Sequence, residues 1–178
     1  YICRSIASNV LPITSDDYYV LGVMAKTTSL SNKIKFIGGA VSEDDLYEDR
    51  IKPLNCAKRE ALEEIGLDLN NNRDISNLEP KYFVTRKNLS FINVLFLASL
   101  NLSSNEVIQL FNGFKASLME EKYEVEIDSI LLVKNDINSI KLFLDKNKNN
   151  LIDYMEDLFL VLVGEHDAKN IIKEVSGI

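Results

Sequence analysis

Apolar residues occur along the chain in short runs that polar stretches separate. Residues 18–25 are rich in aromatic and β-branched side chains, which predicts a buried strand. Residues 33–37 alternate between lysine and apolar side chains, so they predict a strand with one face in water, which Gly38 and Gly39 end. Residues 1–16 show no clear period, and we expect loop with at most one strand there.

The middle and later parts of the chain predict more strands. Residues 81–85 and 91–100 are the two arms of an expected hairpin, joined through Arg86 and Lys87. We expect these two basic side chains to face water, with contact to a phosphate as the alternative. Residues 130–133 predict a last strong strand.

Helical spacing appears in three later stretches. Ser103 and Glu106 offer a capping box for a helix that runs to about Glu120. Two further helices are expected over residues 137–144 and 151–163. A polar turn rich in lysine and asparagine lies between them.

A helix that begins at Pro53 is the most informative element of the chain. Proline fits a first helical turn, where its missing N–H costs nothing, and Gly66 fits the left-handed position after a last turn. We expect the glutamates to lie away from the inner side, which would carry Leu54, Ala57, Ala61 and Ile65. The order of elements favours a mixed α/β sheet with helices on two faces.

Composition limits the class of protein and its partners. The 178 residues, 46% of them apolar, suit one domain over residues 1–178. The net charge is −7 and no basic run with interleaved aromatics occurs, so we expect neither a nucleic acid polymer nor a membrane surface as partner. The longest apolar stretch, residues 158–163, is too short to span a bilayer.

Cysteine and histidine are too scarce for a zinc site. The sequence has two cysteines, Cys3 and Cys56, and one histidine, His166. Two cysteines do not make a disulfide framework. We expect Cys56 to be a packing residue and His166 a surface residue. A reducing, cytoplasmic setting fits this composition.

Three carboxylates on the Pro53 helix point to a cation. Glu60, Glu63 and Glu64 stand at i, i+3 and i+4, so they share one helix face. Such a cluster repels itself unless water or a cation takes up the charge. A cluster of oxygen ligands suits a hard divalent ion such as Mg²⁺ or Mn²⁺.

The same helix carries a resemblance to a known family. One part of the chain resembles the Nudix hydrolase box. It consists of Gly39, an acidic loop and then Arg59-Glu60-Ala61-Leu62-Glu63-Glu64-Ile65-Gly66-Leu67. That box has a glycine, then a glutamate, then Arg-Glu-apolar-x-Glu-Glu-x-Gly-apolar. The second half matches at every defined position.

The first half of the box departs from the pattern. The loop from Gly39 to Arg59 is about six residues longer than the corresponding loop of the family box. Ile37 stands where many members have proline. The upstream glutamate of the box therefore has several candidate counterparts: Glu43, Glu48 and Asp49.

The resemblance implies an α/β/α sandwich with a mixed β-sheet, and a reaction. Nudix enzymes hydrolyse a pyrophosphate linkage in nucleoside diphosphate derivatives with Mg²⁺ or Mn²⁺. By position, Glu63 and Glu64 would be the principal metal ligands, and Glu60 a further ligand or the base. Arg59 would orient these carboxylates by pairing with Glu63.

Two further site assignments follow from the resemblance. Gly38 and Gly39 would bind substrate, a small nucleoside diphosphate derivative. Family members often draw one more glutamate from a segment before the last strand, and we select Glu124 from the candidates Glu120, Glu121, Glu124 and Glu126.

The competing class is a non-catalytic Nudix-like domain that binds a nucleotide metabolite for regulation. The intact carboxylates favour catalysis over that class. A homodimer is compatible with either class.

Residues 145–156 resemble an EF-hand calcium loop, with oxygen side chains at positions 1, 3, 5, 9 and 12. Asn150 replaces the turn glycine, and no paired second loop is visible. We therefore favour a plain turn between helices over calcium binding.

Overall fold

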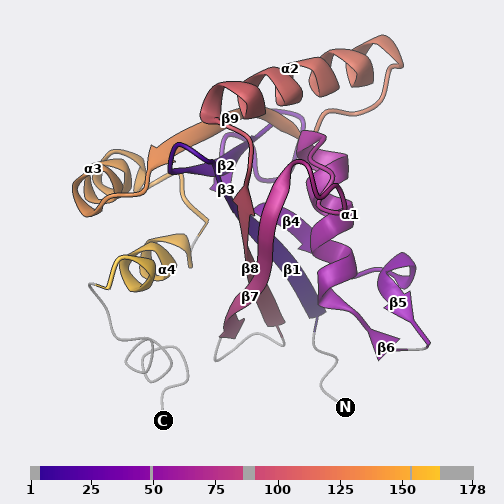
Figure 1. Cartoon of the computed structure of the whole chain (residues 1–178), viewed down its shortest axis with the longest axis horizontal. Coiled ribbons are helices and arrows are strands. Elements are labelled where there is room, and N and C mark those ends of the chain that lie inside the picture. The colour runs from indigo at the N-terminus through magenta and orange to yellow at the C-terminus, as the bar shows by residue number, and fades with distance from the viewer. Residues whose placement is uncertain (1–4, 49, 86–90, 153, 165–178) are drawn as a thin grey trace.

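The computed structural model describes residues 5–48, 50–85, 91–152 and 154–164, and Figure 1 shows α1 on one side of a sheet and α3 and α4 on the other. Seven strands form that sheet: β1 (Ser5–Ile13), β2 (Tyr18–Met24), β3 (Ile34–Lys35), β4 (Ile37–Ala40), β7 (Ile75–Thr85), β8 (Phe91–Leu100) and β9 (Ile127–Lys134). A separate hairpin consists of β5 (Leu46–Tyr47) and β6 (Arg50–Ile51). The helices are the 3₁₀ turn η1 (Glu43–Asp45), α1 (Pro53–Ile65), α2 (Ser104–Glu120), α3 (Ile137–Asn147) and α4 (Met155–Leu162).

Strand β1 lies in the middle of the sheet, in the order β3-β2-β1-β8-β7. It runs parallel to β8 from the Ser5–Phe91 pair onward and antiparallel to β4 and β2, so the sheet is mixed. The expectation that residues 1–16 are mostly loop was wrong. Ser8 and Asn9 interrupt the apolar pattern, yet both are buried because strands lie on each side of β1.

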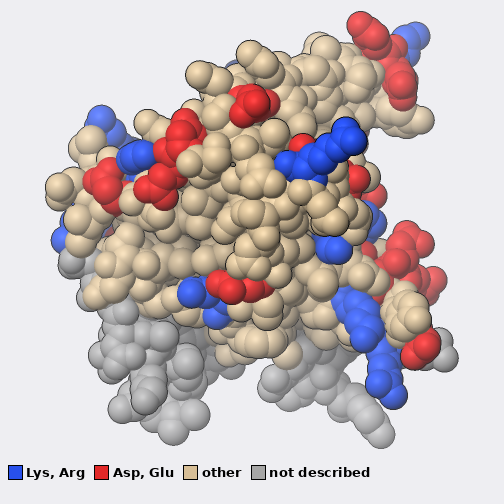
Figure 2. All heavy atoms as spheres, in the orientation of Figure 1, with Lys and Arg blue, Asp and Glu red and all other residues tan. Residues whose placement is uncertain are grey.

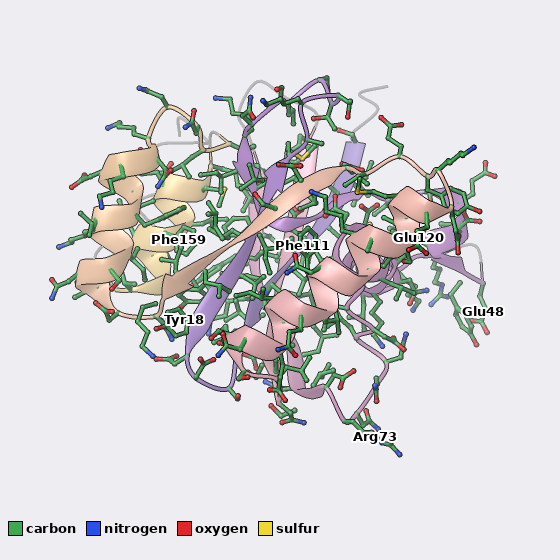
Figure 3. All side chains as sticks on the ribbon, turned by 90° about the horizontal axis from the view of Figure 1, so that it is seen from above. Tyr18, Glu48, Arg73, Phe111, Glu120 and Phe159 are labelled. Atoms are coloured by element: carbon green, nitrogen blue, oxygen red, sulfur yellow. The ribbon has the colours of Figure 1, made fainter. Side chains whose placement is uncertain are left out.

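Helices cover both faces of the sheet, which confirms the α/β/α sandwich. Successive strand residues point to opposite faces, and Val10 belongs to the core under α1 and α2 whereas Leu11 belongs to the core under α3 and α4. In Figure 3, Phe111 on α2 and Phe159 on α4 lie well apart. Each of these two aromatic residues is buried in its own core.

The strand predicted over residues 33–37 has no wet face, contrary to expectation. Ile34 and Phe36 are buried, and Lys35 is only 8% exposed. The stretch divides into β3 and β4, and Gly38 and Gly39 lie inside β4 instead of ending a strand. Segments distant in sequence cause this burial, since Ile34 bridges Leu151.

Helix α1 begins at Pro53, and Gly66 ends it at φ 72°, as predicted. The N–H of Gly66 donates to carbonyls of the last turn, so this glycine satisfies otherwise unpaired groups. Two expectations about its faces were wrong: Leu54 is 37% exposed, and Glu64 is buried.

The other helices follow the sequence with shifted ends. Ser103 and Glu106 form the predicted capping box of α2. The last predicted helix starts at Met155 and not at Leu151, because Leu151 pairs with Ile34 of β3. Within the described residues, no helix has both the length and the apolarity needed to cross a bilayer.

The segment that resembles an EF-hand begins inside a helix. Residues 145–147 belong to α3, and the Asn147 side chain donates to the Phe143 carbonyl. Lys148 pairs with Glu156 across the connection. This arrangement suits the favoured turn between helices.

Strands β7 and β8 pair antiparallel up to Thr85 and Ile92, as a hairpin requires, and β7 starts earlier than predicted, at Ile75. The predictions for Arg86, Lys87 and His166 lie outside the described residues.

Replacing Gly66 by alanine should destabilise the fold. A Cβ there would lie 2.7 Å from Phe114 Cβ, and a positive φ alone costs a non-glycine residue about 1 kcal/mol. We expect a loss of about 1–3 kcal/mol of unfolding free energy in urea denaturation. The matched control is Gly113→Ala within α2, where a Cβ has open space, and it should gain up to about 1 kcal/mol. Equal stability of the two variants would contradict this account.

Candidate functional site

The site lies where α1 packs on β4 through two glycines. Gly38 has φ +144°, and a Cβ there would collide with the Ser8 carbonyl oxygen. A Cβ on Gly39 would lie 2.6 Å from Glu60 Oε2. The absence of a Cβ on Gly39 therefore lets the Glu60 carboxylate of α1 approach the strand backbone, and the absence of a Cβ on Gly38 lets β4 pack closely on β1.

Arg59 gathers the acidic groups around it. Its Nε and Nη2 donate to the two oxygens of Asp45 at 3.0 and 2.9 Å, a bidentate pair. Its Nη1 lies 2.8 Å from Glu63 Oε2 and 2.8 Å from Glu60 Oε1, and Nη2 also reaches the Ala40 carbonyl at 3.3 Å. The guanidinium thus ties α1 to the acidic loop and to β4, and the predicted pairing with Glu63 is present.

Asp45 is the acidic partner that the sequence reasoning missed. It is buried in η1, where Ser42 N donates to its Oδ2 at 2.9 Å. Of the candidates named from the sequence, Glu43 and Glu48 are exposed and Asp49 lies outside the described residues. The spacing Ser42-x-x-Asp45 was an available signal, since it resembles a capping box.

The three glutamates of α1 have different environments. Glu63 has a side chain 57% exposed, whereas Glu64 is 5% exposed and Glu60 is mostly covered. Burial raises the pKa of Glu60, although the Arg59 guanidinium opposes it. Burial likewise raises the pKa of Glu64 to about 7, against the opposing charge of Lys35.

Lys35 is a second functional candidate that the sequence did not indicate. Its Nζ donates to Glu64 Oε1 at 2.5 Å, to the Gly38 carbonyl at 2.9 Å and to Glu126 Oε1 at 3.4 Å. Burial opposes the charge on Lys35, but Glu64 and Glu126 outweigh it and raise the lysine pKa. Of the glutamates before β9, Glu126 therefore reaches this cluster, although its side chain is 51% exposed, and the selected Glu124 is also exposed.

The side chains as they lie do not form the metal site that the resemblance implies. Among residues that the structure describes, no group of three or more Asp, Glu, His or Cys side chains is placed to hold one metal ion. Glu60 and Glu63 turn to Arg59, and Glu64 turns to Lys35. The metal-binding role of these glutamates stays a prediction.

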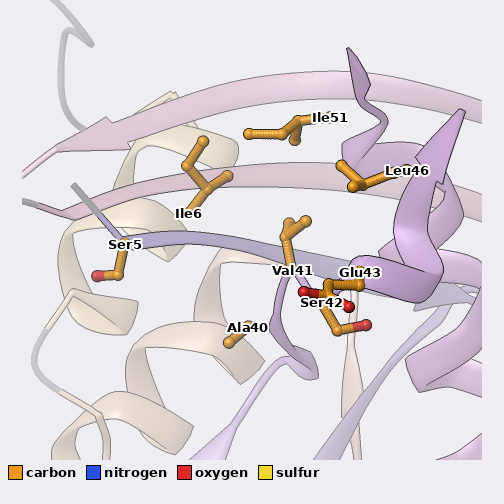
Figure 4. Close-up of a pocket in the computed structure, with 8 residues that line it drawn as sticks. All are labelled: Ser5, Ile6, Ala40, Val41, Ser42, Glu43, Leu46 and Ile51. Atoms are coloured by element: carbon orange, nitrogen blue, oxygen red, sulfur yellow. The ribbon is translucent and has the colours of Figure 1, made fainter. Parts of the chain in front are cut away.

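Two hollows adjoin strand β4. One, of about 290 Å³, includes Lys35, Gly38, Gly39 and the aromatic residues Phe36, Phe91 and Tyr154 among its lining. The other, of about 420 Å³, lies beside the acidic loop (Figure 4) and is lined by Ser5, Ile6, Ala40, Val41, Ser42, Glu43, Leu46 and Ile51.

Basic and acidic side chains are interspersed on the face of the molecule in Figure 2.

Neither a family model nor a curated protein sequence matches the chain. Solved structures do match. A MutT protein from Methanosarcina mazei Go1 is 14% identical, with 91% of this chain and 94% of that one covered and a TM-score of 0.57. A NUDIX hydrolase from Nitrosomonas europaea is 10% identical, with 91% and 89% covered and a TM-score of 0.53.

The chain has the Nudix fold. A third structure with this likeness is a bifunctional NMN adenylyltransferase/ADP ribose pyrophosphatase from Francisella tularensis, complexed with AMP and an Mn ion. It is 11% identical with a TM-score of 0.52, and the match covers 91% of this chain but 42% of that one. The match to the Nudix fold confirms the fold class that the box on α1 predicted.

Replacing Asp45 by asparagine should loosen the Arg59 cluster. Burial would raise the pKa of Asp45, but hydrogen bonds from Arg59 and Ser42 outweigh it and hold the pKa below its ordinary value of 3.8. We expect Asp45→Asn to lose about 2 kcal/mol of unfolding free energy at neutral pH. The carboxylate's contribution is complete above pH 3.8 and disappears as pH falls through the lowered folded-state pKa, so the two proteins should converge there.

Urea denaturation at a series of pH values measures this difference. Asp44→Asn is the matched control, because Asp44 is the exposed neighbour in η1 and should change stability by less than about 0.5 kcal/mol. A loss in Asp45→Asn no larger than in that control would show that the Arg59–Asp45 pair contributes little.

Proposed function

We propose that the chain is a pyrophosphohydrolase that cleaves a diphosphate linkage in a small nucleoside diphosphate derivative. One observation carries this proposal: in a Nudix fold, Glu60 and Glu64 of α1 lie against the side-chain-free backbone of Gly39 and Gly38, and Arg59 links Glu60 to Glu63. A carboxylate cluster beside a glycine backbone can bind a phosphorylated ligand when a cation balances the negative charges of the carboxylates and the phosphates.

The hollow beside Lys35 supports a small ligand. Its volume of about 290 Å³ lies at the lower end of ligand-site volumes, and Gly38 and Gly39 form part of its wall. We propose that these glycines contact the diphosphate and that the aromatic walls accept an adjoining apolar or planar group. A nucleic acid polymer would need a continuous basic surface, whereas the face in Figure 2 carries basic and acidic side chains side by side.

Glu60 is the residue we propose as general base. Its pKa is raised by burial, and a carboxylate with a raised pKa is a stronger proton acceptor. The attacking water would form a new P–O bond as the bridging P–O bond breaks, and its proton would pass to Glu60. Arg59 is a positioning residue in this scheme, because its donors already bind Asp45, Glu60 and Glu63.

The proposed cofactor is Mg²⁺, with Mn²⁺ as the alternative, held principally by Glu63 and Glu64, and Glu60 would be a further ligand if it is not the base. A bound divalent cation would neutralise the diphosphate charge and lower the pKa of water. Carboxylate oxygens are the ligands these ions prefer, and the Francisella tularensis protein was crystallised with an Mn ion. Because these glutamates now face Arg59 and Lys35, such binding requires at least some of them to turn.

A second candidate is the non-catalytic Nudix-like domain that binds a nucleotide metabolite. One observation favours it: the Lys35 ammonium already contacts Glu64 and Glu126 and balances one of their two negative charges. A site whose carboxylate charge is partly balanced by its own lysine can bind a nucleotide metabolite without catalysing its hydrolysis.

A panel of nucleoside diphosphate derivatives separates the two candidates. We expect one or more of them to release phosphate or nucleotide when Mg²⁺ or Mn²⁺ is present, as followed by chromatography. Tight binding of one compound by calorimetry, with no turnover of any, would replace the hydrolase with the binding domain.

Glu63→Gln should remove activity and keep the fold. The change removes a proposed ligand's charge with little change in shape, so we expect kcat to fall roughly hundredfold. Glu63 is largely exposed, so the melting temperature should change little. Glu120→Gln, at the exposed end of α2, is the control and should keep full activity. Parent-level turnover by Glu63→Gln would show that Glu63 is no metal ligand.

A further inference from the structure

The Lys35 ammonium occupies a position built for a cation. Lysine is seldom this buried without partners that satisfy it, and here the side chain is only 10% exposed. An ammonium has three donors, and three oxygens receive them: Glu64 Oε1, Glu126 Oε1 and the Gly38 carbonyl.

These three acceptors are also a donor set for a divalent ion. Two carboxylates and one backbone carbonyl are hard oxygen ligands of the kind that Mg²⁺ and Mn²⁺ prefer. They come from three separate elements: Glu64 from α1, Gly38 from β4, and Glu126 from the residue before β9. The fold itself therefore assembles the oxygens around one point.

The charge at that point is only half balanced by lysine. Glu64 and Glu126 together carry two negative charges when ionised, and Lys35 carries one positive charge. A divalent ion would balance the pair fully. Glu64 would stay in place in either case, because the Gly38 N–H donates to its other oxygen, Oε2, at 2.9 Å.

We propose that Lys35 is a tethered cation that holds the place of a divalent metal ion between Glu64, Glu126 and the Gly38 carbonyl. Lys35 and a metal ion compete for these oxygens, so the wild-type chain binds a metal here only when the lysine leaves. This inference rests on the metal role proposed above for Glu64, but it concerns cation binding without substrate and does not require that the chain be a hydrolase.

Removing the ammonium should open the position to a metal. We expect Lys35→Met to bind Mn²⁺ at least about tenfold more tightly than the wild type, since a positive charge within contact distance of the oxygens is lost. Mn²⁺ binding is measured by electron paramagnetic resonance without any nucleotide. Lys33→Met is the matched control, because Lys33 lies two residues away, its ammonium contacts the Asn149 carbonyl and not the acidic cluster, and the substitution gives the same change in net charge.

Two further measurements fix the position and guard against misfolding. Adding Glu64→Gln to Lys35→Met should abolish the gain in Mn²⁺ affinity. Mn²⁺ should raise the melting temperature of Lys35→Met more than that of Lys33→Met, because the ion replaces the lost ammonium beside buried Glu64. Equal Mn²⁺ affinity of the two single variants, a gain that persists with Glu64→Gln, or a Lys35→Met protein that stays unfolded in Mn²⁺ would each overturn the proposal. Substrate turnover plays no part in these readouts, so a failed hydrolase proposal leaves them interpretable.

Discussion

The close approach of α1 to β4 is the constraint on which the rest of the site depends. Gly39 carries no Cβ, so the Glu60 carboxylate can lie against the strand backbone. Gly38 adopts a backbone conformation that side chains rarely allow, and this conformation lets its N–H and its carbonyl serve Glu64 and Lys35. A larger residue at Gly39 would meet the Glu60 carboxylate and push α1 away, whereas one at Gly38 would collide with Ser8 and Asn9 of β1.

Local signals explain why the helix could be predicted from the sequence. Pro53 and Gly66 mark the ends of α1 by the backbone conformations they favour. The same holds for α2, whose capping box involves residues only three positions apart. The Nudix box added the fold class, because its helix and the glycines before it occur together in that fold.

Non-local contacts explain what the sequence did not show. Lys35 appeared to belong to a wet strand face, yet its partners Glu64 and Glu126 lie 29 and 91 positions away. Asp45 was hidden by its many acidic neighbours, and its hydrogen bonds with Arg59 and Ser42 distinguish it from Glu43 and Glu48. Alternation along a strand reports burial only when the opposite face meets water, and here α1 and the residue before β9 cover it.

The parallel pairing of β1 with β8 sets the order in which the chain can be assembled. The central strand β1 is made before the other strands of this sheet, but its parallel partner starts only at Phe91. Until then β1 has apolar residues such as Val10 and Leu11 and one unpaired edge, and contacts this distant in sequence form slowly. The nascent chain therefore carries an incomplete sheet until β8 has been made, a state in which association with other chains competes with folding.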